Sequence, residues 1–337
     1  MNNSQSLLEI HHLKKYFPIE KGLLRRVVGY VRAVDDVSLT IRKGKTLGLV
    51  GESGSGKTTL GHCVMRTYTL TAGEIRLRLP DKEVDLGQLS RAELRPYRRH
   101  LQMIFQDPYS SLDPRKTVYD IVSEPLRINR IASGRELENR VRDLLELVGL
   151  GVQYMKRYPH AFSGGQRQRL GIARALALNP ELIVCDEAVS ALDVSVQAQI
   201  LNLLKALQQE LGLTFLFIAH DLSVVDHIAD EVAVMYVGKI VEQAPTRQLF
   251  TAPKHPYTEA LISAIPMPDP DRPLSQEGLE GELPDPANPP QGCYFHPRCR
   301  YAQAVCREEA PPWEKIDEDH HVACHFAAEL TLDGIVA

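Results

Sequence analysis

Residues 51–58 read Gly-Glu-Ser-Gly-Ser-Gly-Lys-Thr and follow a short apolar run, Thr46–Val50. The pattern G-x-x-x-x-G-K-[ST], placed between a strand and a helix, is typical of a loop that wraps phosphate groups. Its glycines let backbone N–H groups point at phosphate oxygens, and the positive end of the next helix adds to the attraction. We expect Lys57 to neutralise the β- and γ-phosphates and the Thr58 hydroxyl to bind Mg²⁺. The alternative is an ordinary glycine-rich turn without a binding function.

Alternating strand-like and helix-like segments surround this loop, which predicts an α/β domain with a parallel-sheet core. The apolar runs 181–186 and 214–219 resemble strands that are covered on both faces. A hairpin is expected over 231–243, with its turn at Val237-Gly238. The expected helices are residues 58–65, 133–149 and 196–211.

Two of these helices carry sequence signals at their ends. Ser133 and Glu136 fit a capping box at the start of the first, and Gly149 can stop it. In the second, Gly212 follows the last helical residue. Its expected buried stripe consists of Ile200, Leu203, Leu204, Leu207 and Leu211.

The first residues lack the apolar core of a signal peptide, and no run approaches the roughly 18 to 20 apolar residues of a membrane span. We therefore expect a cytoplasmic chain that reaches a membrane only by docking onto other subunits. A formal charge of −4 does not favour nucleic acid as a partner. A proline-rich stretch divides the chain, and it predicts a main domain over 7–265, a linker over 266–292 and a cysteine-rich region over 293–337.

The apolar run 181–186 ends in Asp186, and Glu187 follows. Carboxylates at the carboxyl end of a parallel strand lie where ligands bind in such sheets. We expect Asp186 to hold Mg²⁺ and Glu187 to polarise the attacking water. An Asp-Glu pair alone is more often a solvated strand end. The presence of the phosphate loop in the same chain makes a catalytic role the better interpretation.

The segment Ser163-Gly164-Gly165-Gln166 resembles the signature sequence of ABC ATPases. The rest of that family's pattern follows in order. Gln106 resembles its glutamine loop, residues 190–193 its D-loop, and His220 its switch histidine. The resemblance covers about residues 8–243, and it implies a P-loop NTPase of the ABC-ATPase type with a parallel-sheet core, an antiparallel β subdomain and a helical subdomain over about 95–170.

The resemblance also implies the roles of individual residues. Glu187, His220 and Gln106 would be catalytic, and Thr58, Gln106 and Asp186 would hold Mg²⁺. Tyr16 resembles the aromatic residue that stacks on adenine, although Phe17 could take that place. The remaining residues that would bind ATP are Gly51, Ser53, Gly54, Ser55, Gly56, Lys57, Thr58, Thr59, Asp186, Ser163, Gly164, Gly165, Gln166 and Asp193. The family usually has proline where this chain has Ala188, from which we expect at most a change in loop rigidity.

Three further features resemble the ATP-binding subunits of oligopeptide and dipeptide importers. They are the long segment after Tyr16, the His255-Pro256-Tyr257 triplet and the Gly-Cys-Tyr-Phe-His-Pro-Arg-Cys run at 292–299. The resemblance implies an ATPase that energises uptake of peptides, with nickel, opine or sugar import as alternatives. Its implied partners are a second homologous ATPase subunit, two membrane permease subunits and an extracytoplasmic solute-binding protein. Its implied location is the cytoplasmic face of the cell membrane.

Cys293, Cys299, Cys306 and Cys324 crowd into the end of the chain, whereas Cys63 and Cys185 lie alone and are expected to be small buried hydrophobes. In a reducing compartment such a cluster suggests a metal site sooner than disulfides. The spacing C-x₅-C-x₆-C-x₁₇-C matches neither the common zinc ribbons nor the usual ferredoxin run. The family resemblance implies a [4Fe-4S] site; zinc, which the nearby histidines would suit, and free thiols or a disulfide stay open.

Two other classes of function compete with a transport ATPase. The first is a soluble ABC ATPase that acts on ribosomes or DNA, but such chains usually carry two cassettes or a long coiled-coil insertion, and this sequence shows neither. The second is a regulatory protein with a vestigial ATPase, and the complete catalytic set argues against it.

Overall fold

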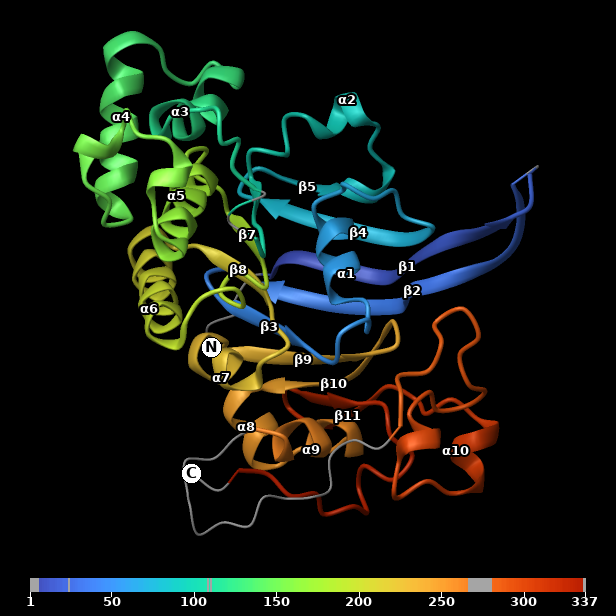
Figure 1. The fold of residues 1–337 in the computed structure, drawn as a ribbon. Helices are drawn as coiled ribbons and strands as arrows, with labels where there is room; N and C mark the ends of the chain where they lie inside the picture. The colour runs from blue at the N-terminus through green and yellow to red at the C-terminus, as the bar shows by residue number, and fades with distance from the viewer. Residues whose placement is uncertain (1–5, 24, 108, 110, 266–280, 336–337) are drawn as a thin grey trace. The chain divides into compact units, whose positions relative to one another are not determined.

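The computed structural model describes residues 6–335, apart from Leu24, Pro108, Ser110 and residues 266–280. The chain forms two compact units (Figure 1). The unit that holds the phosphate loop, here called the phosphate-loop unit, comprises Ser6–Arg42, Thr46–Gln88 and Ile218–Ala337. The unit that holds Asp186 and Glu187, here called the carboxylate unit, comprises Lys43–Lys45 and Leu89–Phe217.

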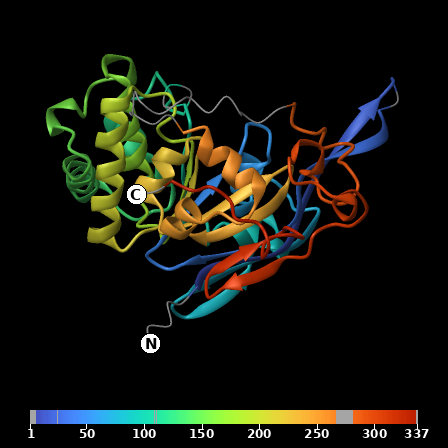
Figure 2. The same cartoon turned by 90° about the horizontal axis from the view of Figure 1, so that it is seen from below.

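An antiparallel sheet in the phosphate-loop unit is built on one long hairpin. β1 (Ser6–Lys21) pairs with β2 (Arg26–Arg42), and β4 (Ala72–Leu79) and β5 (Lys82–Asp85) complete the order β2-β1-β4-β5. β2 begins at Arg26 and runs for 17 residues. The tip of the hairpin extends away from the rest of its unit in both views (Figures 1 and 2).

The second sheet of this unit is mixed and carries the phosphate loop. Its strands are β11 (Glu314–Asp317), β12 (His320–Val322), β10 (Lys239–Pro245), β9 (Glu231–Tyr236) and β3 (Thr46–Val50), in that order. β3 and β9 are parallel, and the other neighbours are antiparallel. Val237 and Gly238 form the β9–β10 turn with φ of +40° and +79°. Two positive φ angles match the right-handed twist of a hairpin, and the predicted turn is confirmed.

Short helices accompany these strands in the phosphate-loop unit. They are α1 (Lys57–Val64), α7 (Leu222–Ile228), α8 (Thr246–Thr251), α9 (Pro256–Ser263) and α10 (Ala304–Glu308), with 3₁₀ turns at Leu86–Gln88 and His296–Arg298. α7 packs on β3 so closely that a Cβ atom on Gly48 would lie 2.5 Å from Val225 Cγ1. A bare backbone at Gly48 therefore sets the spacing between this helix and the sheet.

The carboxylate unit combines strands with most of the longer helices. β6 (Leu101–Ile104) is parallel to β7 (Leu182–Asp186), and β8 (Thr214–Ile218), whose residues 214–217 belong to this unit, lies beyond β7. All residues of β7 and β8 are buried, as the sequence predicts. The helices are α2 (Arg91–Leu94), α3 (Val118–Ile128), α4 (Gly134–Leu147), α5 (Gly164–Leu176) and α6 (Val194–Leu211), with 3₁₀ turns at Val152–Tyr154 and Pro159–Ala161.

The helix ends differ in part from the expectation. Ser133 is the N-cap of α4, but its side chain makes no cap hydrogen bond with the described residues, so the predicted capping box is wrong. Gly134 follows at a left-handed φ of +55°, which turns the chain away from the geometry that a capping box needs. Gly212 ends α6 at φ +66°, as expected. On α6, Leu201 is buried and Leu211 is 46% exposed, so the buried stripe shifts from the predicted one.

The predicted linker and tail lie in the phosphate-loop unit where they are described. The prolines of 266–280 fall outside the described residues, and the described part of the linker, 281–292, consists of turns and extended chain. The Pro286 carbonyl accepts a hydrogen bond from the Arg32 N–H of β2 at 3.0 Å. This part of the linker is therefore attached to the antiparallel sheet.

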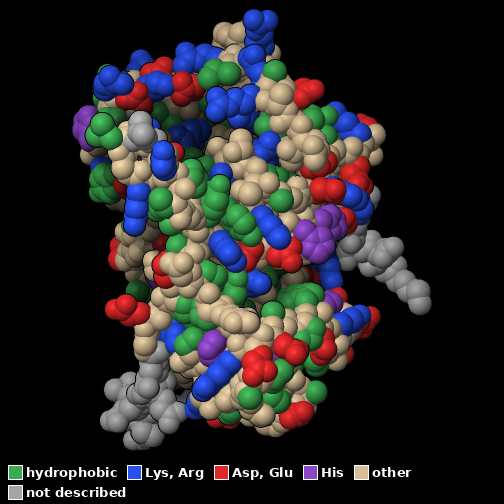
Figure 3. Space-filling model, turned by 90° about the vertical axis from the view of Figure 1, so that its right-hand side faces the viewer, with side chains coloured by type: hydrophobic (Ala, Val, Ile, Leu, Met, Phe, Trp, Pro, Cys, Tyr) green, Lys and Arg blue, Asp and Glu red, His purple; other side chains and the backbone are tan. Residues whose placement is uncertain are grey.

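Acidic and basic side chains are interspersed with apolar ones on the face drawn in Figure 3. No helix within the described ranges combines the length and the apolar character that crossing a membrane requires.

A buried carboxylate joins the C-terminal residues to the mixed sheet. Glu242 of β10 is fully buried, and its oxygens accept hydrogen bonds from the Lys254 and His255 N–H groups at 2.7 and 2.9 Å. His320 of β12, which is 1% exposed, lies 2.7 Å from the same carboxylate. One side chain thus connects β10, β12 and the start of α9.

We expect Glu242→Ala to lower the free energy of unfolding by about 3–5 kcal/mol, because it leaves a partly buried N–H group, a buried N–H group and a buried imidazole without their partner. Urea unfolding of the full chain, followed by circular dichroism, measures the change. Glu314→Ala, at an exposed position of β11, is the matched control and should unfold as the wild type does. Equal midpoints for the two variants would contradict the role given to Glu242.

Candidate functional site

The phosphate loop in the phosphate-loop unit is held by close backbone contacts. Gly51 follows the fully buried strand β3 at φ +148°, and Gly56 precedes α1 at φ +107°. A Cβ atom on Gly51 would lie 2.1 Å from the Met235 carbonyl oxygen, and one on Gly56 would lie 2.1 Å from that of Ala33. Only glycine fits at either place, because both the φ angle and the space exclude a side chain. This cradle of bare backbone fits a bound phosphate chain.

Lys57, the lysine predicted to contact the phosphates, is 4% exposed. Its Nζ donates hydrogen bonds to the carbonyl oxygens of Gly51 and Glu52, at 2.7 and 2.8 Å, and lies 3.4 Å from Ser55 Oγ. The ammonium group is therefore held across the loop by the loop's own backbone. Thr58, on the first turn of α1, is exposed.

Two of the three residues expected to be catalytic, Gln106 and Glu187, meet in the carboxylate unit. Asp186 ends β7 and is 6% exposed. Gln106 Nε2 donates a hydrogen bond of 2.7 Å to Glu187 Oε2, although the two residues are 81 positions apart. Glu187 has a φ of +46°, in the left-handed region that non-glycine residues rarely occupy. Ser190 fixes this conformation, since its N–H and its hydroxyl both donate to the Glu187 carbonyl, at 3.1 and 3.0 Å.

The signature segment begins helix α5 in the same unit. Ser163 is the N-cap, and it forms a reciprocal capping box with Gln166 through hydrogen bonds of 3.4 and 3.1 Å. A Cβ atom on Gly165 would lie 2.4 Å from Val196 Cγ1 of α6. Glycine is therefore required for α5 to approach α6, and the exposed start of α5 provides backbone N–H groups for an anion.

The D-loop ends at Asp193, which is the N-cap of α6. Its carboxylate accepts hydrogen bonds from the Val196 N–H at 3.0 Å and from the Ser195 hydroxyl at 2.7 Å. The Val196 N–H is the chief cause of a lowered pKa for Asp193. The carboxylate is thus held charged at the start of the helix.

His220 belongs to the phosphate-loop unit and is exposed. The preceding Ala219 N–H donates a hydrogen bond of 3.1 Å to the Leu49 carbonyl of β3. Because Leu49 lies just before the phosphate loop, His220 emerges at the same end of β3 as that loop.

Two aromatic residues compete for the position beside adenine, and both lie on β1. The Tyr16 hydroxyl donates to the Asp35 carboxylate, whose other oxygen accepts from Tyr294 at 3.1 Å. The Phe17 ring packs edge-on against Tyr68, with ring centroids 5.4 Å apart. Tyr16 is therefore tied to the C-terminal residues, and Phe17 to the segment after α1.

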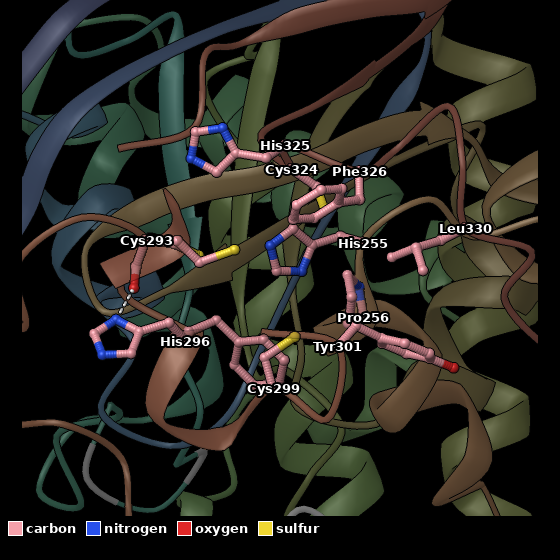
Figure 4. A pocket seen from close by; sticks show the side chains of 12 residues that line it. His255, Pro256, Cys293, His296, Cys299, Tyr301, Cys324, His325, Phe326 and Leu330 are labelled. Atoms are coloured by element: carbon pink, nitrogen blue, oxygen red, sulfur yellow. Dashed lines mark hydrogen bonds between the residues drawn. The ribbon is translucent and has the colours of Figure 1, made fainter. Parts of the chain in front are cut away.

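All four tail cysteines line one pocket in the phosphate-loop unit (Figure 4). The sulfur atoms of Cys293 and Cys299 point into the same space, and His296 Nδ1 donates to the Cys293 carbonyl at 2.9 Å. The other lining residues are His255, Pro256, Phe295, His296, Tyr301, His325, Phe326 and Leu330. Burial raises the pKa of the Cys299 thiol to about 12 and that of Cys324 to about 11.

Within the described residues, no group of three or more His, Cys, Asp or Glu side chains is placed to hold one metal ion. Cys63 and Cys185 are fully buried, as predicted, and burial raises the pKa of both thiols.

Sequence reasoning missed three residues that contact or belong to the phosphate loop. Glu52, the second residue of the loop, receives hydrogen bonds from Arg298 of the tail, and its N–H donates to the Tyr257 hydroxyl. Tyr257 lies in the His255-Pro256-Tyr257 triplet, which the sequence analysis treats only as a family marker. The occurrence of that triplet together with the run at 292–299 was the available signal.

Comparisons with known proteins agree with this geometry. The family model described as "ABC transporter" matches residues 34–190, which include the phosphate loop, the signature segment and Glu187. The model described as "Oligopeptide/dipeptide transporter, C-terminal region" matches residues 241–306, which include Tyr257 and Arg298.

Curated relatives match over nearly the whole chain. The oligopeptide transport ATP-binding protein AppF of Bacillus subtilis is 51% identical over 327 residues, which are 96% of this chain and 98% of AppF. The dipeptide transport ATP-binding protein DppF of Haemophilus influenzae is 49% identical over 94% of this chain and 96% of DppF.

A solved structure of the ATP-binding cassette MJ0796, a dimer in a post-hydrolysis state bound to ADP and Pi, has a TM-score of 0.62 and 28% identity. It matches 71% of this chain and 99% of its own. The fold, the motifs and the full-length relatives agree, and the chain belongs to the family of ATP-binding subunits of oligopeptide and dipeptide ABC transporters.

Proposed function

We propose that this chain hydrolyses ATP to energise the import of dipeptides or oligopeptides. The observation that carries the ATPase is the contact between Gln106 and Glu187 in a chain that also holds a complete phosphate loop. The choice of peptides as the transported solute rests on the match of residues 241–306 to the C-terminal region of oligopeptide and dipeptide transporters. The relatives AppF and DppF are named for oligopeptide and dipeptide transport.

Each residue has a defined part in hydrolysis. The bare backbone of the loop receives the phosphates, and Lys57 supplies positive charge to them. Thr58, Asp186 and Gln106 are the groups that would hold Mg²⁺, which offsets phosphate charge when bound. Glu187 accepts a proton from the attacking water, and the Gln106 amide orients its carboxylate. His220 acts near the γ-phosphate.

The exposed start of α5 is proposed to complete the nucleotide site of a second ATPase subunit. Ser163 and the N–H groups behind it form an anion-binding helix end. In a heterodimer of homologous ATPase subunits, that end faces the γ-phosphate held by the other subunit, and hydrolysis removes the charge that joins them. Two membrane permease subunits and an extracytoplasmic solute-binding protein complete the importer. The chain is then peripheral, on the cytoplasmic face of the membrane.

The four tail cysteines are proposed to hold a [4Fe-4S] cluster. Such clusters take four cysteine thiolates, and each thiolate binds a different iron atom, so the sulfurs need not meet at one point. A single zinc ion would need its ligands within about 2.3 Å of one position. All four cysteines line one pocket, so they could serve together as the ligands of such a cluster.

Glu187→Gln is expected to lower ATP turnover by about 100-fold or more, because the amide cannot accept the proton of the attacking water. Binding of MgATP should persist, since no charge that contacts the phosphates is lost. Steady-state phosphate release and equilibrium nucleotide binding measure the two effects. Glu210→Gln, an exposed position on α6, is the matched control. Normal turnover by Glu187→Gln would refute its assignment as the base.

Anaerobically purified chain is expected to contain iron and acid-labile sulfide and to absorb at about 400 nm. Cys299→Ser should reduce all three signals, whereas Cys63→Ala should retain them because Cys63 is a buried residue on α1. Stoichiometric zinc without iron in the wild-type protein would refute the proposal of an iron–sulfur cluster.

The solute is tested with the assembled importer. Uptake of labelled dipeptides and oligopeptides in vesicles that contain all its subunits should require ATP and be abolished by Glu187→Gln. Uptake of nickel, an opine or a sugar in place of peptides would move the chain to another branch of the same family.

A further inference from the structure

Arg298 makes a partly buried ion pair with the phosphate loop. Its Nη1 lies 2.6 Å from Glu52 Oε2, and its Nη2 lies 3.0 Å from Glu52 Oε1. The Arg298 side chain is 5% exposed and Glu52 is 28% exposed. Two parallel N–H···O bonds to one carboxylate are the strongest geometry for such a pair, and they fix orientation as well as distance.

Tyr257 holds the same loop residue by its backbone. The Glu52 N–H donates a hydrogen bond of 2.7 Å to the Tyr257 hydroxyl oxygen. The Tyr257 ring is fully buried and packs against Tyr236 and Phe295, with centroid separations of 4.6 and 5.4 Å. Burial also raises the pKa of Tyr257, so the hydroxyl stays neutral. A rigid, uncharged acceptor therefore sets the direction of the Glu52 N–H.

Every polar group of Glu52 has a partner. Arg298 holds its carboxylate, Tyr257 its N–H, and Lys57 Nζ donates to its carbonyl at 2.8 Å. Leu283 lies near the loop, because its Cδ2 would be 3.5 Å from a Cβ atom placed on Gly54. The C-terminal residues thus determine how the Gly51–Glu52 peptide is oriented and where Lys57 is held.

The charges of Glu52 and Arg298 should affect how tightly the loop binds a nucleotide. Glu52 carries a negative charge on the loop that receives the phosphates, and such a charge opposes an anionic ligand, the more so where water is partly excluded. Arg298 neutralises it from the side of the tail. Without Arg298, the carboxylate would remain on the loop uncompensated.

We propose that Arg298 and Tyr257 are positioning residues for the phosphates of ATP, through which the C-terminal region of this chain forms part of its nucleotide site. They act on the phosphates through Glu52 and Lys57 and do not contact the nucleotide. The inference rests on the proposed ATPase function, and it gives the tail a role in binding ATP.

The test is MgATP and MgADP binding by the full chain, with the melting temperature measured alongside. Arg298→Gln should raise the Kd of both nucleotides roughly tenfold. Glu52→Gln with Arg298→Gln should bind more tightly than Arg298→Gln alone, because the uncompensated carboxylate is gone. Tyr257→Phe keeps the ring packing, removes the acceptor and should raise Kd severalfold. Arg307→Gln, an exposed arginine of the same region, is the matched control and should bind as the wild type does.

A purely structural role predicts a different pattern. Arg298→Gln and Tyr257→Phe would then melt at a lower temperature while their Kd values stayed at the wild-type level, and this would overturn the proposal. Equal Kd values for Arg298→Gln and for its double variant with Glu52→Gln would remove the charge argument. Failure of the wild-type chain to bind MgATP would instead refute the proposed function itself.

Discussion

The nucleotide site depends on a steric constraint at the two ends of the phosphate loop. Gly51 and Gly56 have φ angles that suit glycine, and each passes so close to a carbonyl oxygen that a Cβ atom would lie 2.1 Å from it. Those oxygens belong to Met235 of β9 and Ala33 of β2. Because the loop is seated between strands of both sheets of its unit, its N–H groups have a fixed direction before any ligand arrives, and less entropy is lost when phosphate binds.

The sequence predicts best where the controlling interaction is local. The phosphate loop, the Val237-Gly238 turn, the end of α6 at Gly212 and the two buried strands each have their signal in a short run of sequence, and all were predicted. The errors have a local cause as well. The capping box at Ser133 fails because Gly134 adopts a left-handed φ, which a sequence pattern does not reveal.

Contacts across long stretches of sequence could not be predicted. The Gln106–Glu187 pair spans 81 residues, the Tyr257–Glu52 bond 205 and the Arg298–Glu52 pair 246. The family resemblance indicated Gln106 and Glu187 as functional residues, because both belong to known motifs. It did not indicate the Tyr257–Glu52 and Arg298–Glu52 contacts. Charge and hydrogen-bonding capacity on separate segments do not show which of many possible partners a side chain contacts in the folded chain.

The tail cysteines and the phosphate loop are linked by one short run of residues. Cys293, Phe295 and Cys299 line the cysteine pocket, and Phe295 also packs on Tyr257, while Arg298 reaches Glu52. A group bound by the cysteines, as proposed above, would therefore also hold the 3₁₀ turn His296–Arg298, which presents Arg298 to the loop. Because a bidentate ion pair fixes orientation as well as distance, such a group would couple order at the cysteines to order at the phosphate loop.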